Sequence, residues 1–282
     1  MAHCAGSECG RWRPDVLVGS VGVGLRFEGE WYCSEACLEA EATARLEIAT
    51  SGEAPTIPGF PRSRLGTVLL SRQVLTRTQL SAGLVEQRRR GWRLGRTLTG
   101  LGLVSGLDVL RALAAQAGVD YLSAIDESHV ARGPGNFGPR AVRLLGLVPF
   151  EVDEARRRMK VACVAPLPRK ALAAVRAITS WTVDAFLVTD EQWERLASAY
   201  GRDRRAADPA EEEAGELVGS VPEAAAHIAR RVARGQVQRM QYARCAPYVW
   251  IRLEGPRTED LVLPLGGART KESRWPVVPM SH

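Results

Sequence analysis

The stretch RLGTVLLSRQVLTRTQLSAGLVEQ (Arg64–Gln87) is followed, after the spacer RRRGW, by RLGRTLTGLGLVSGLDVLRALAAQ (Arg93–Gln116). Each copy opens with Arg-Leu-Gly and closes with Gln, and the offset that relates Arg64 to Arg93 also relates Gln87 to Gln116. Repetition at a fixed offset is a primary indicator of architecture. Because two copies are too few for a solenoid, we expect a paired unit with one shared core, or one two-sided site.

Each copy is predicted to contain two helices joined by a turn, because apolar residues recur in it at helical spacing. A capping pattern opens the second helix of each copy. The capping pairs are Thr76 with Gln79 and Ser105 with Asp108. A hydrophobic core alone explains the leucines. A core has no use for an arginine at a fixed place in both copies, which makes Arg64 and Arg93 candidate binding residues.

The N-terminal segment 1–42 carries four of the six cysteines in two close pairs, Cys4 with Cys9 and Cys33 with Cys37. In a reducing compartment, paired cysteines favour a metal over disulfides. Four thiolates suit tetrahedral zinc, and such a closed shell is structural rather than catalytic. The alternative is four unrelated thiols. We expect the two isolated cysteines, Cys163 and Cys245, to be core residues.

Short strands are predicted at Val16–Val23 and Leu25–Trp31, and a helix at Glu35–Arg45. The segment resembles zinc-ribbon or treble-clef fingers, whose second knuckle reads like the Tyr-Cys-Ser-Glu-Ala-Cys found here. The first knuckle departs from the commonest spacing, since it has four intervening positions rather than two. His3, beside Cys4, is an alternative ligand.

Composition is typical of a globular protein: 282 residues, 45% hydrophobic and 25% charged, enough for about two domains. The sequence shows neither an apolar signal segment nor an apolar run long enough to cross a membrane, so we expect a cytoplasmic protein. The net charge of +6 indicates an anionic partner. Because almost all the basic residues are arginines, as codon bias in a GC-rich genome would produce, a nucleic-acid partner is not favoured.

No motif for catalysis stands out. ATP hydrolysis requires a glycine-rich loop ending in Gly-Lys-Ser/Thr, and the residues before the three lysines are Met159, Arg169 and Thr270. The four histidines (His3, His129, His227 and His282) do not cluster in the sequence. We therefore expect a regulatory or adaptor protein rather than an enzyme.

The repeat pair with its short spacer resembles the N-terminal domain of bacterial type II secretion and type IV pilus assembly ATPases. It is specifically similar to their MshEN domains, which bind cyclic di-GMP. Two positions depart from the family pattern: Gln73 replaces a glycine, and Thr99 replaces an apolar residue. Glutamine adopts a positive φ less readily than glycine, so a distorted first turn is expected.

The resemblance implies a binding site for cyclic di-GMP, in which Arg64 and Arg93 each take the O6 and N7 acceptors of one guanine. It further implies that Gly66 and Gly95 allow close approach, that leucines face the rings, and that glutamines add hydrogen bonds. The leucines are Leu65, Leu69, Leu94 and Leu98, and the glutamines are Gln87 and Gln116. The competing hypotheses are a nucleotide-independent adaptor docking onto secretion or pilus machinery, and a zinc-ribbon nucleic-acid binder.

The resemblance continues into a small α/β unit after the repeats. Its expected elements are helices at Pro139–Leu147 and Asp190–Tyr200, and strands at Leu147–Val152, Met159–Val164 and Val183–Val188. A helix at Ala224–Ala233, capped by Ser220, is expected to lead into strands at Arg239–Arg244, Tyr248–Glu254 and Asp260–Leu265.

The fold class predicted is α+β: an N-terminal zinc finger, a helical repeat pair packed with a small α/β unit, and a small C-terminal α+β segment. The predicted boundaries are 1–42 for the finger, 43–62 for a linker, 63–201 for the repeat-containing domain, 202–216 for a second linker, 217–265 for the C-terminal segment and 266–282 for a tail.

Overall fold

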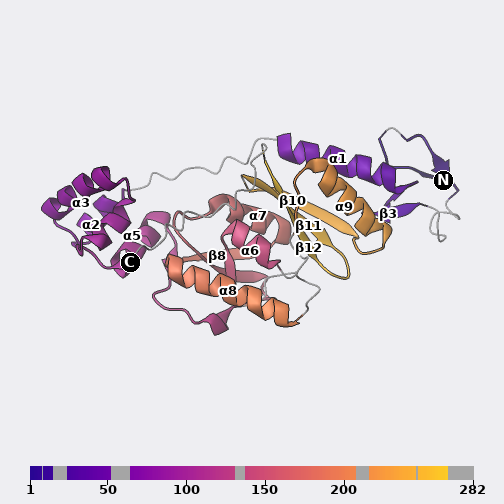
Figure 1. Cartoon of the computed structure of the whole chain (residues 1–282). Coiled ribbons are helices and arrows are strands. Elements are labelled where there is room, and N and C mark those ends of the chain that lie inside the picture. Colours follow the sequence, from indigo (N-terminus) through magenta and orange to yellow (C-terminus); the bar gives the residue numbers. More distant parts are fainter. Residues whose placement is uncertain are drawn as a thin grey trace. The chain divides into compact units, whose positions relative to one another are not determined.

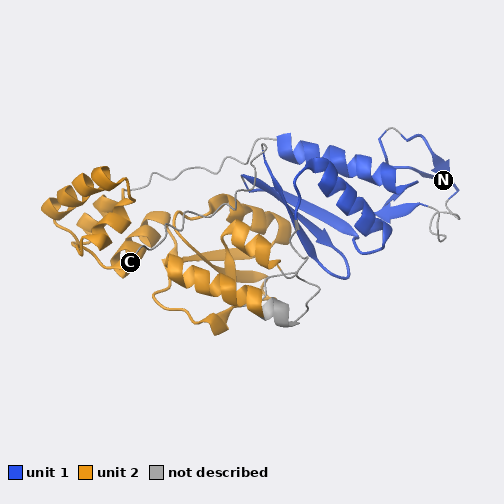
Figure 2. Cartoon of the chain, in the orientation of Figure 1, with its two compact units in different colours: residues 1–54, 216–282 blue, residues 55–215 orange. Residues whose placement is uncertain are grey.

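The computed structural model describes residues 1–7, 9–14, 24–51, 64–130, 137–207, 216–245 and 247–265. The chain divides into two compact units, shown in Figure 2: unit 1 comprises residues 1–54 and 216–282, and unit 2 comprises residues 55–215. The fold is mixed α+β, as the sequence predicted. The predicted strand Val16–Val23, the tail 266–282 and parts of both linkers lie outside the described residues.

The repeat pair forms four helices at the start of unit 2 (Figure 1). They are α2 (Leu65–Ser71), α3 (Arg77–Arg90), α4 (Leu94–Gly100) and α5 (Gly106–Ala117). Both predicted capping boxes are present: the Thr76 and Ser105 hydroxyls accept hydrogen bonds from the backbone N–H groups of Gln79 and Asp108, whose side chains reach back to the cap N–H groups. Each long helix therefore begins where its cap is encoded.

The helices pack mainly across the repeats: α2 lies against α5, and α3 lies against α4. Most residues of the core between them have an equivalent in the other copy that is also part of it. Examples are Leu69 with Leu98, Leu75 with Val104, and Leu80 with Val109. The two copies thus share one core with approximate two-fold symmetry, as expected for a paired unit.

The turn inside each copy is the same, although one contains Gln73 and the other Gly102. Gln73 has φ +58° and Gly102 has φ +67°. In the first copy, Val74 N–H donates to the Leu69 carbonyl at 3.0 Å; in the second, Leu103 N–H donates to the Leu98 carbonyl, also at 3.0 Å. The expected distortion is therefore absent, and glutamine adopts the left-handed conformation instead.

Replacing Gln73 by glycine should stabilise unit 2. A left-handed residue with a Cβ costs about 1–2 kcal/mol, of which the greater chain entropy of glycine offsets about 0.5–1 kcal/mol. Denaturant unfolding of Gln73→Gly should therefore give a free energy of unfolding about 0.5–1 kcal/mol above wild type. Gly102→Gln is the reciprocal variant and should lower the free energy of unfolding. If neither variant changes the free energy of unfolding, the left-handed conformation of Gln73 carries no cost.

A four-stranded sheet and further helices complete unit 2. The strands are β5 (Asp120–Tyr121), β6 (Val148–Asp153), β7 (Arg158–Cys163) and β8 (Thr182–Leu187), in the order β5-β8-β7-β6. The helices are a 3₁₀ turn (Glu127–His129), α6 (Pro139–Leu145), α7 (Arg169–Thr179) and α8 (Asp190–Ala207). Strands β7 and β8 are parallel and joined through α7, whereas β6 and β7 are antiparallel. The predicted elements are confirmed with small shifts, except that α8 continues to Ala207 into the predicted linker.

Unit 1 begins with two small hairpins and ends in a four-stranded sheet covered by two helices (Figure 1). The N-terminal elements are β1 (Ala2–His3), β2 (Trp12–Arg13), β3 (Leu25–Phe27), β4 (Glu30–Tyr32) and α1 (Glu35–Ser51). The C-terminal elements are β9 (Glu216–Leu217), α9 (Val221–Ala233), β10 (Arg239–Arg244), β11 (Tyr248–Glu254) and β12 (Glu259–Pro264). The sheet order is β10-β11-β12-β9, and β9 runs parallel to β12.

The finger and the C-terminal segment, which are predicted as separate domains, share one hydrophobic core. Leu38, Ala42 and Leu46 lie on one face of α1 and are buried together with Ile228 of α9 and Ile251 of β11. The predicted helix end at Arg45 is also too early, because the buried stripe extends to Leu46 and α1 continues to Ser51. A segment of about 40 residues cannot by itself bury enough apolar surface to be stable, so α1 packs on the distant sheet.

The loop of the β3–β4 hairpin joins the two ends of the chain by hydrogen bonds. Glu28 and Gly29 both have positive φ, 53° and 86°, as a tight two-residue hairpin turn requires. The Glu28 carboxylate accepts a hydrogen bond from the Met240 N–H at 2.8 Å and pairs with Arg45 at 2.6 Å. The Glu28 N–H donates to the Gln238 carbonyl at 3.2 Å. The N-terminal hairpin is therefore fastened to the start of β10.

Among the described helices, none combines the length and hydrophobicity that crossing a bilayer would require.

Candidate functional site

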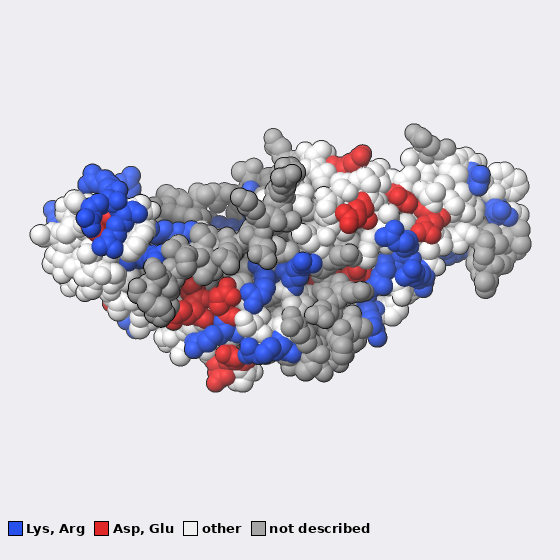
Figure 3. All heavy atoms as spheres, in the orientation of Figure 1, with Lys and Arg blue, Asp and Glu red and all other residues white. Residues whose placement is uncertain are grey.

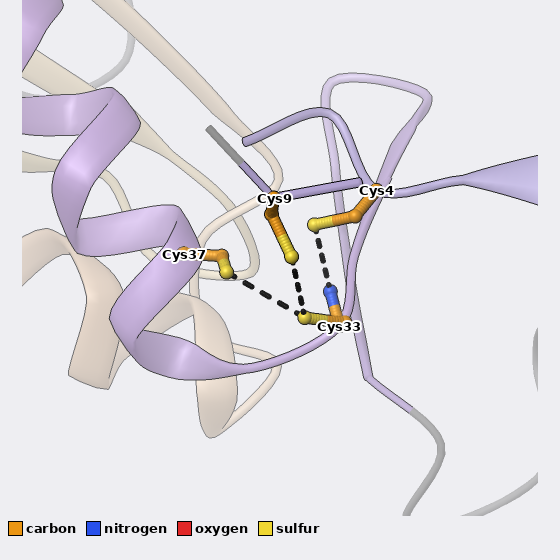
Figure 4. Close-up of side chains that lie close together, drawn as sticks. All are labelled: Cys4, Cys9, Cys33 and Cys37. Carbon is orange, nitrogen blue, oxygen red and sulfur yellow. Dashed lines mark hydrogen bonds between the residues drawn. The ribbon is translucent and has the colours of Figure 1, made fainter. Parts of the chain in front are cut away.

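Four cysteine side chains converge at the N-terminal end of unit 1 (Figure 4). The sulfur atoms of Cys4, Cys9, Cys33 and Cys37 all lie within 4.8 Å of one another. Cys33 Sγ is 3.4 Å from Cys9 Sγ and 3.5 Å from Cys37 Sγ. Four thiolates bound tetrahedrally to zinc at about 2.3 Å would be separated by about 3.8 Å, so this cluster fits such an ion with small adjustments.

Local structure positions each sulfur. Cys33 follows β4, and Cys37 lies in the first turn of α1, where the Ser34 hydroxyl accepts a hydrogen bond from the Cys37 N–H at 3.3 Å. The Cys33 N–H donates to Cys4 Sγ at 3.3 Å, a contact that stabilises a thiolate. His3 is exposed and is not part of the group, so the alternative histidine ligand gains no support.

The thiols of the cluster differ in acidity. Hydrogen bonds, chiefly one involving the Arg11 backbone and then those with Cys33 and Cys37, lower the pKa of Cys9 to about 7. Burial, followed by hydrogen bonding with Cys9, raises the pKa of Cys33 to about 12. A bound divalent cation deprotonates its thiol ligands outright, so all four would bind as thiolates. The cysteines outside the cluster, Cys163 and Cys245, are buried, as predicted.

The second candidate site lies at the Arg-Leu-Gly turns. Arg64 and Arg93 are the N-cap residues of α2 and α4, and their backbones are nearly identical, with φ/ψ of −65°/142° and −67°/143°. Both side chains are exposed. Among the described residues, no hydrogen bond or ion pair involves either guanidinium. Two arginines in equivalent positions are thus available to a ligand.

The glycines that follow these arginines are explained by helix packing. A Cβ on Gly66 would lie 2.8 Å from Leu80 Cδ1, and one on Gly95 would lie 2.8 Å from Val109 Cγ1, an equivalent contact in the second copy. The Gly95 Cβ would also lie 3.6 Å from Leu65 Cδ2. The first turns of α2 and α4 therefore touch, which brings the two Arg-Leu-Gly segments to the same region.

The apolar residues assigned to the site divide into two groups. Leu69 and Leu98 are fully buried in the shared core and have no surface to offer a ligand. This corrects the expectation that they face the guanine rings, because helices as short as α2 and α4 must bury their central leucines to pack at all. Leu65 and Leu94 are only half-buried and keep some accessible surface.

The glutamines come to the site from opposite copies. A Cβ on Gly83 of α3 would overlap Leu98 and approach Leu94, both on α4. Gln87 lies one turn beyond Gly83 on the same face, toward the start of α4, since positions i and i+4 of a helix share a face. Gln116 is the equivalent residue of α5, the helix that lies against α2. A ligand bound at the two helix starts would thus meet, in each half-site, an arginine of one copy and a glutamine of the other.

The positive charge of the protein is concentrated in the repeat segment. The segment 64–117 contains nine arginines and only two acidic residues, Glu86 and Asp108, whereas the whole chain has a net charge of +6. Outside the repeats the chain is therefore nearly neutral. Figure 3 shows basic side chains gathered over the α3 region. Counting charge by segment would have revealed this from the sequence, whereas the averaged net charge concealed it.

No protein-family model and no curated protein matches the chain. Solved structures similar to it include MshE with cdg, at 23% identity and a TM-score of 0.39, covering 50% of this chain and 99% of that chain. The N-terminal domain of XpsE is similar at 22% identity and a TM-score of 0.33, covering 48% of this chain and 92% of that chain. At these identities and TM-scores the likeness assigns no ligand, so function is inferred from the residues of this chain.

Proposed function

We propose that this protein is a non-catalytic regulatory or adaptor protein that binds cyclic di-GMP through its two Arg-Leu-Gly turns. The observation that carries the proposal is the pair of exposed arginines, Arg64 and Arg93, which have equivalent backbone conformations beside touching helix starts. A site with approximate two-fold symmetry suits a ligand that has two identical halves.

The chemistry of the ligand matches the groups available. Guanine presents O6 and N7 on one edge, and the planar fork of an arginine can donate to both. Gln87 and Gln116 add amide donors and acceptors, and Leu65 and Leu94 add partly exposed apolar surface. The two phosphates of the ligand would be attracted by the arginine-rich surface of the repeats. Close backbone approach is not assigned to Gly66 and Gly95, because packing explains both.

The four-cysteine cluster is proposed to hold one structural zinc ion. All four groups are cysteine thiols, and four protein ligands fill the tetrahedral coordination shell of zinc. A site with no open coordination position suits a structural ion rather than a catalytic one. Elemental analysis of protein purified without chelator should find one zinc per chain. Protein that is folded in unit 1 and contains no metal would overturn this assignment.

Calorimetric titration with cyclic di-GMP tests the proposed ligand. We expect saturable binding at one site per chain, and a free energy of unfolding that rises by about 2.7 kcal/mol at a hundredfold excess of ligand over Kd. Cyclic di-AMP is the matched control, since adenine offers a donor where guanine has O6. Equal heats from both nucleotides, or none from either, would contradict the proposal.

Catalysis is not expected, because the sequence has no Gly-Lys-Ser/Thr segment to hold nucleotide phosphates. An ATPase assay should give a rate that does not follow the protein through purification. A rate that does follow it would show that another set of residues binds and cleaves ATP.

A nucleotide-independent adaptor is the second candidate, and one face of α3 favours it. Val85 is 58% exposed and Leu84 is 38% exposed, whereas Ala114, the equivalent of Val85 in α5, is 2% exposed. Helix α5 contacts strands β5 and β8, whereas the outer face of α3 carries exposed apolar residues. Such a face suits docking to a partner, and the sequence resemblance points to secretion or pilus machinery as the class. Under this alternative, Val85→Asp should abolish partner binding, whereas cyclic di-GMP should neither bind the wild-type protein nor change its affinity for the partner.

A further inference from the structure

A tryptophan flanked by arginines lies between the two repeats, beside the second Arg-Leu-Gly turn. The guanidinium carbon of Arg90 is 4.8 Å from the centroid of the Trp92 ring, and that of Arg96 is 4.5 Å from it. We refer to Arg90, Trp92 and Arg96 as the Trp92 cluster. A cation held over an indole ring is stabilised even at an exposed site, so the ring fixes the direction of both arginines.

The charges of the cluster are only partly neutralised. Arg90 and Arg89 share the carboxylate of Glu86. Arg96 is exposed, and no described carboxylate pairs with it. The Trp92 ring is half-buried and lies along α4, since a Cβ on Gly100 would be 3.9 Å from Trp92 Cζ3. Within the described part of the chain, Arg96 is therefore a positioned cation without a counter-ion.

The first repeat has no equivalent cluster. In the alignment of the two copies, Arg96 corresponds to Thr67, and Trp92 and Arg90 correspond in the sequence to serine and proline. Both repeats keep their other features, including the N-cap arginine, the glycine and the capping box. The cluster is thus an addition to one copy and not a requirement of the fold.

We propose that the Trp92 cluster is an anion-binding part of the second half-site, in which Arg96 contacts a phosphate of the bound nucleotide. Arg93 is the N-cap residue of α4 and Arg96 lies in the first turn of the same helix, so one ligand is within reach of both side chains. Arg93 then takes the guanine edge, and Arg96 takes the neighbouring phosphate through a charge-assisted hydrogen bond. The inference rests on the proposed function. It implies that the two half-sites differ, because only the second has an arginine at this position to contact a phosphate.

The test is titration of Arg96→Thr with cyclic di-GMP, because threonine is the residue that the first copy carries at this position. Because Arg96→Thr removes a hydrogen bond to a charged group, its affinity for cyclic di-GMP should fall roughly tenfold to hundredfold. Arg77→Thr is the matched control: Arg77 is an exposed arginine of the same unit outside the site, and its loss should leave affinity unchanged. Thermal melting checks that both variants remain folded.

Trp92→Phe gives a second measurement. The difference in emission between wild type and Trp92→Phe isolates the fluorescence of Trp92, and ligand should change it. Two results would overturn this inference while leaving the proposed function in place. In one, Arg96→Thr binds cyclic di-GMP as tightly as Arg77→Thr does. In the other, the emission change caused by the ligand is the same in Trp92→Phe as in wild type. Absence of binding by wild type would instead overturn the proposed function, and the inference with it.

Discussion

Chelation of the metal should unfold all of unit 1, including its C-terminal part 216–265, and should leave unit 2 folded. Structural zinc contributes about 10–16 kcal/mol of apparent binding free energy in small fingers, whereas a whole domain is stable by only about 5–15 kcal/mol. Loss of the ion should therefore lower the free energy of unfolding of unit 1 by about as much as its whole stability. From the sequence alone, only the predicted finger, 1–42, would be expected to unfold.

The wider unfolding follows from how the finger is joined to the sheet. Cys37 lies in the first turn of α1, and the same helix buries Leu38 and Leu46 against α9 and the strands. The carboxylate of Glu28 accepts a hydrogen bond from the Met240 N–H, which connects the β3–β4 hairpin to β10. Because these contacts form one core, unfolding of the finger exposes the apolar face of the C-terminal sheet.

Hydrogen exchange measured by mass spectrometry checks this result. Chelator should abolish protection in α1, α9 and β10–β12 together, and should leave α7 and β7 protected. Cys37→Ser should reproduce the effect without chelator. Cys245→Ser is the control, because Cys245 is buried in the same unit outside the cluster and a hydroxyl can still donate to the Tyr248 carbonyl. Protection of α9 and β10–β12 that persists in metal-free protein would show that the sheet is stable without the finger.

Arg64→Ala and Arg93→Ala should each weaken binding of cyclic di-GMP by about 1–3 kcal/mol, the usual contribution of a bidentate guanine contact. Neither change should lower the melting temperature appreciably, because both side chains are exposed and neither guanidinium has a partner among the described residues. The double variant should bind too weakly for calorimetric detection. Affinity is measured by calorimetry and stability by thermal melting.

Arg77→Ala is the matched control, since it removes one positive charge from the exposed surface of the same unit at a helix start. An equal loss of affinity in Arg77→Ala would indicate general attraction by positive charge rather than recognition of guanine. A different result would be that the Arg64 and Arg93 variants melt well below wild type and that wild type itself shows no heat of binding. That result would assign the arginines a structural role and favour the nucleotide-independent adaptor.

Much of the local structure was determined by the sequence itself. The capping pairs Thr76–Gln79 and Ser105–Asp108 fixed the starts of α3 and α5, because a cap satisfies backbone N–H groups within one turn of itself. The spacing of the cysteines likewise predicted a four-thiol cluster, whose sulfur atoms the structure brings within 4.8 Å of one another. Signals of this kind act over a short stretch of chain, or through chemistry that demands one geometry.

Only the tertiary structure decided which elements pack together. The sequence indicated four repeat helices but not that α2 pairs with α5 and α3 with α4, an arrangement that buries Leu69 and Leu98 and removes them from the site. Nor did it indicate that α1 completes a core with strands from the opposite end of the chain. An apolar stripe shows that a helix must be covered, but the hydrophobic effect is non-directional, so the stripe does not specify the partner. That choice depends on how the whole chain fills its core.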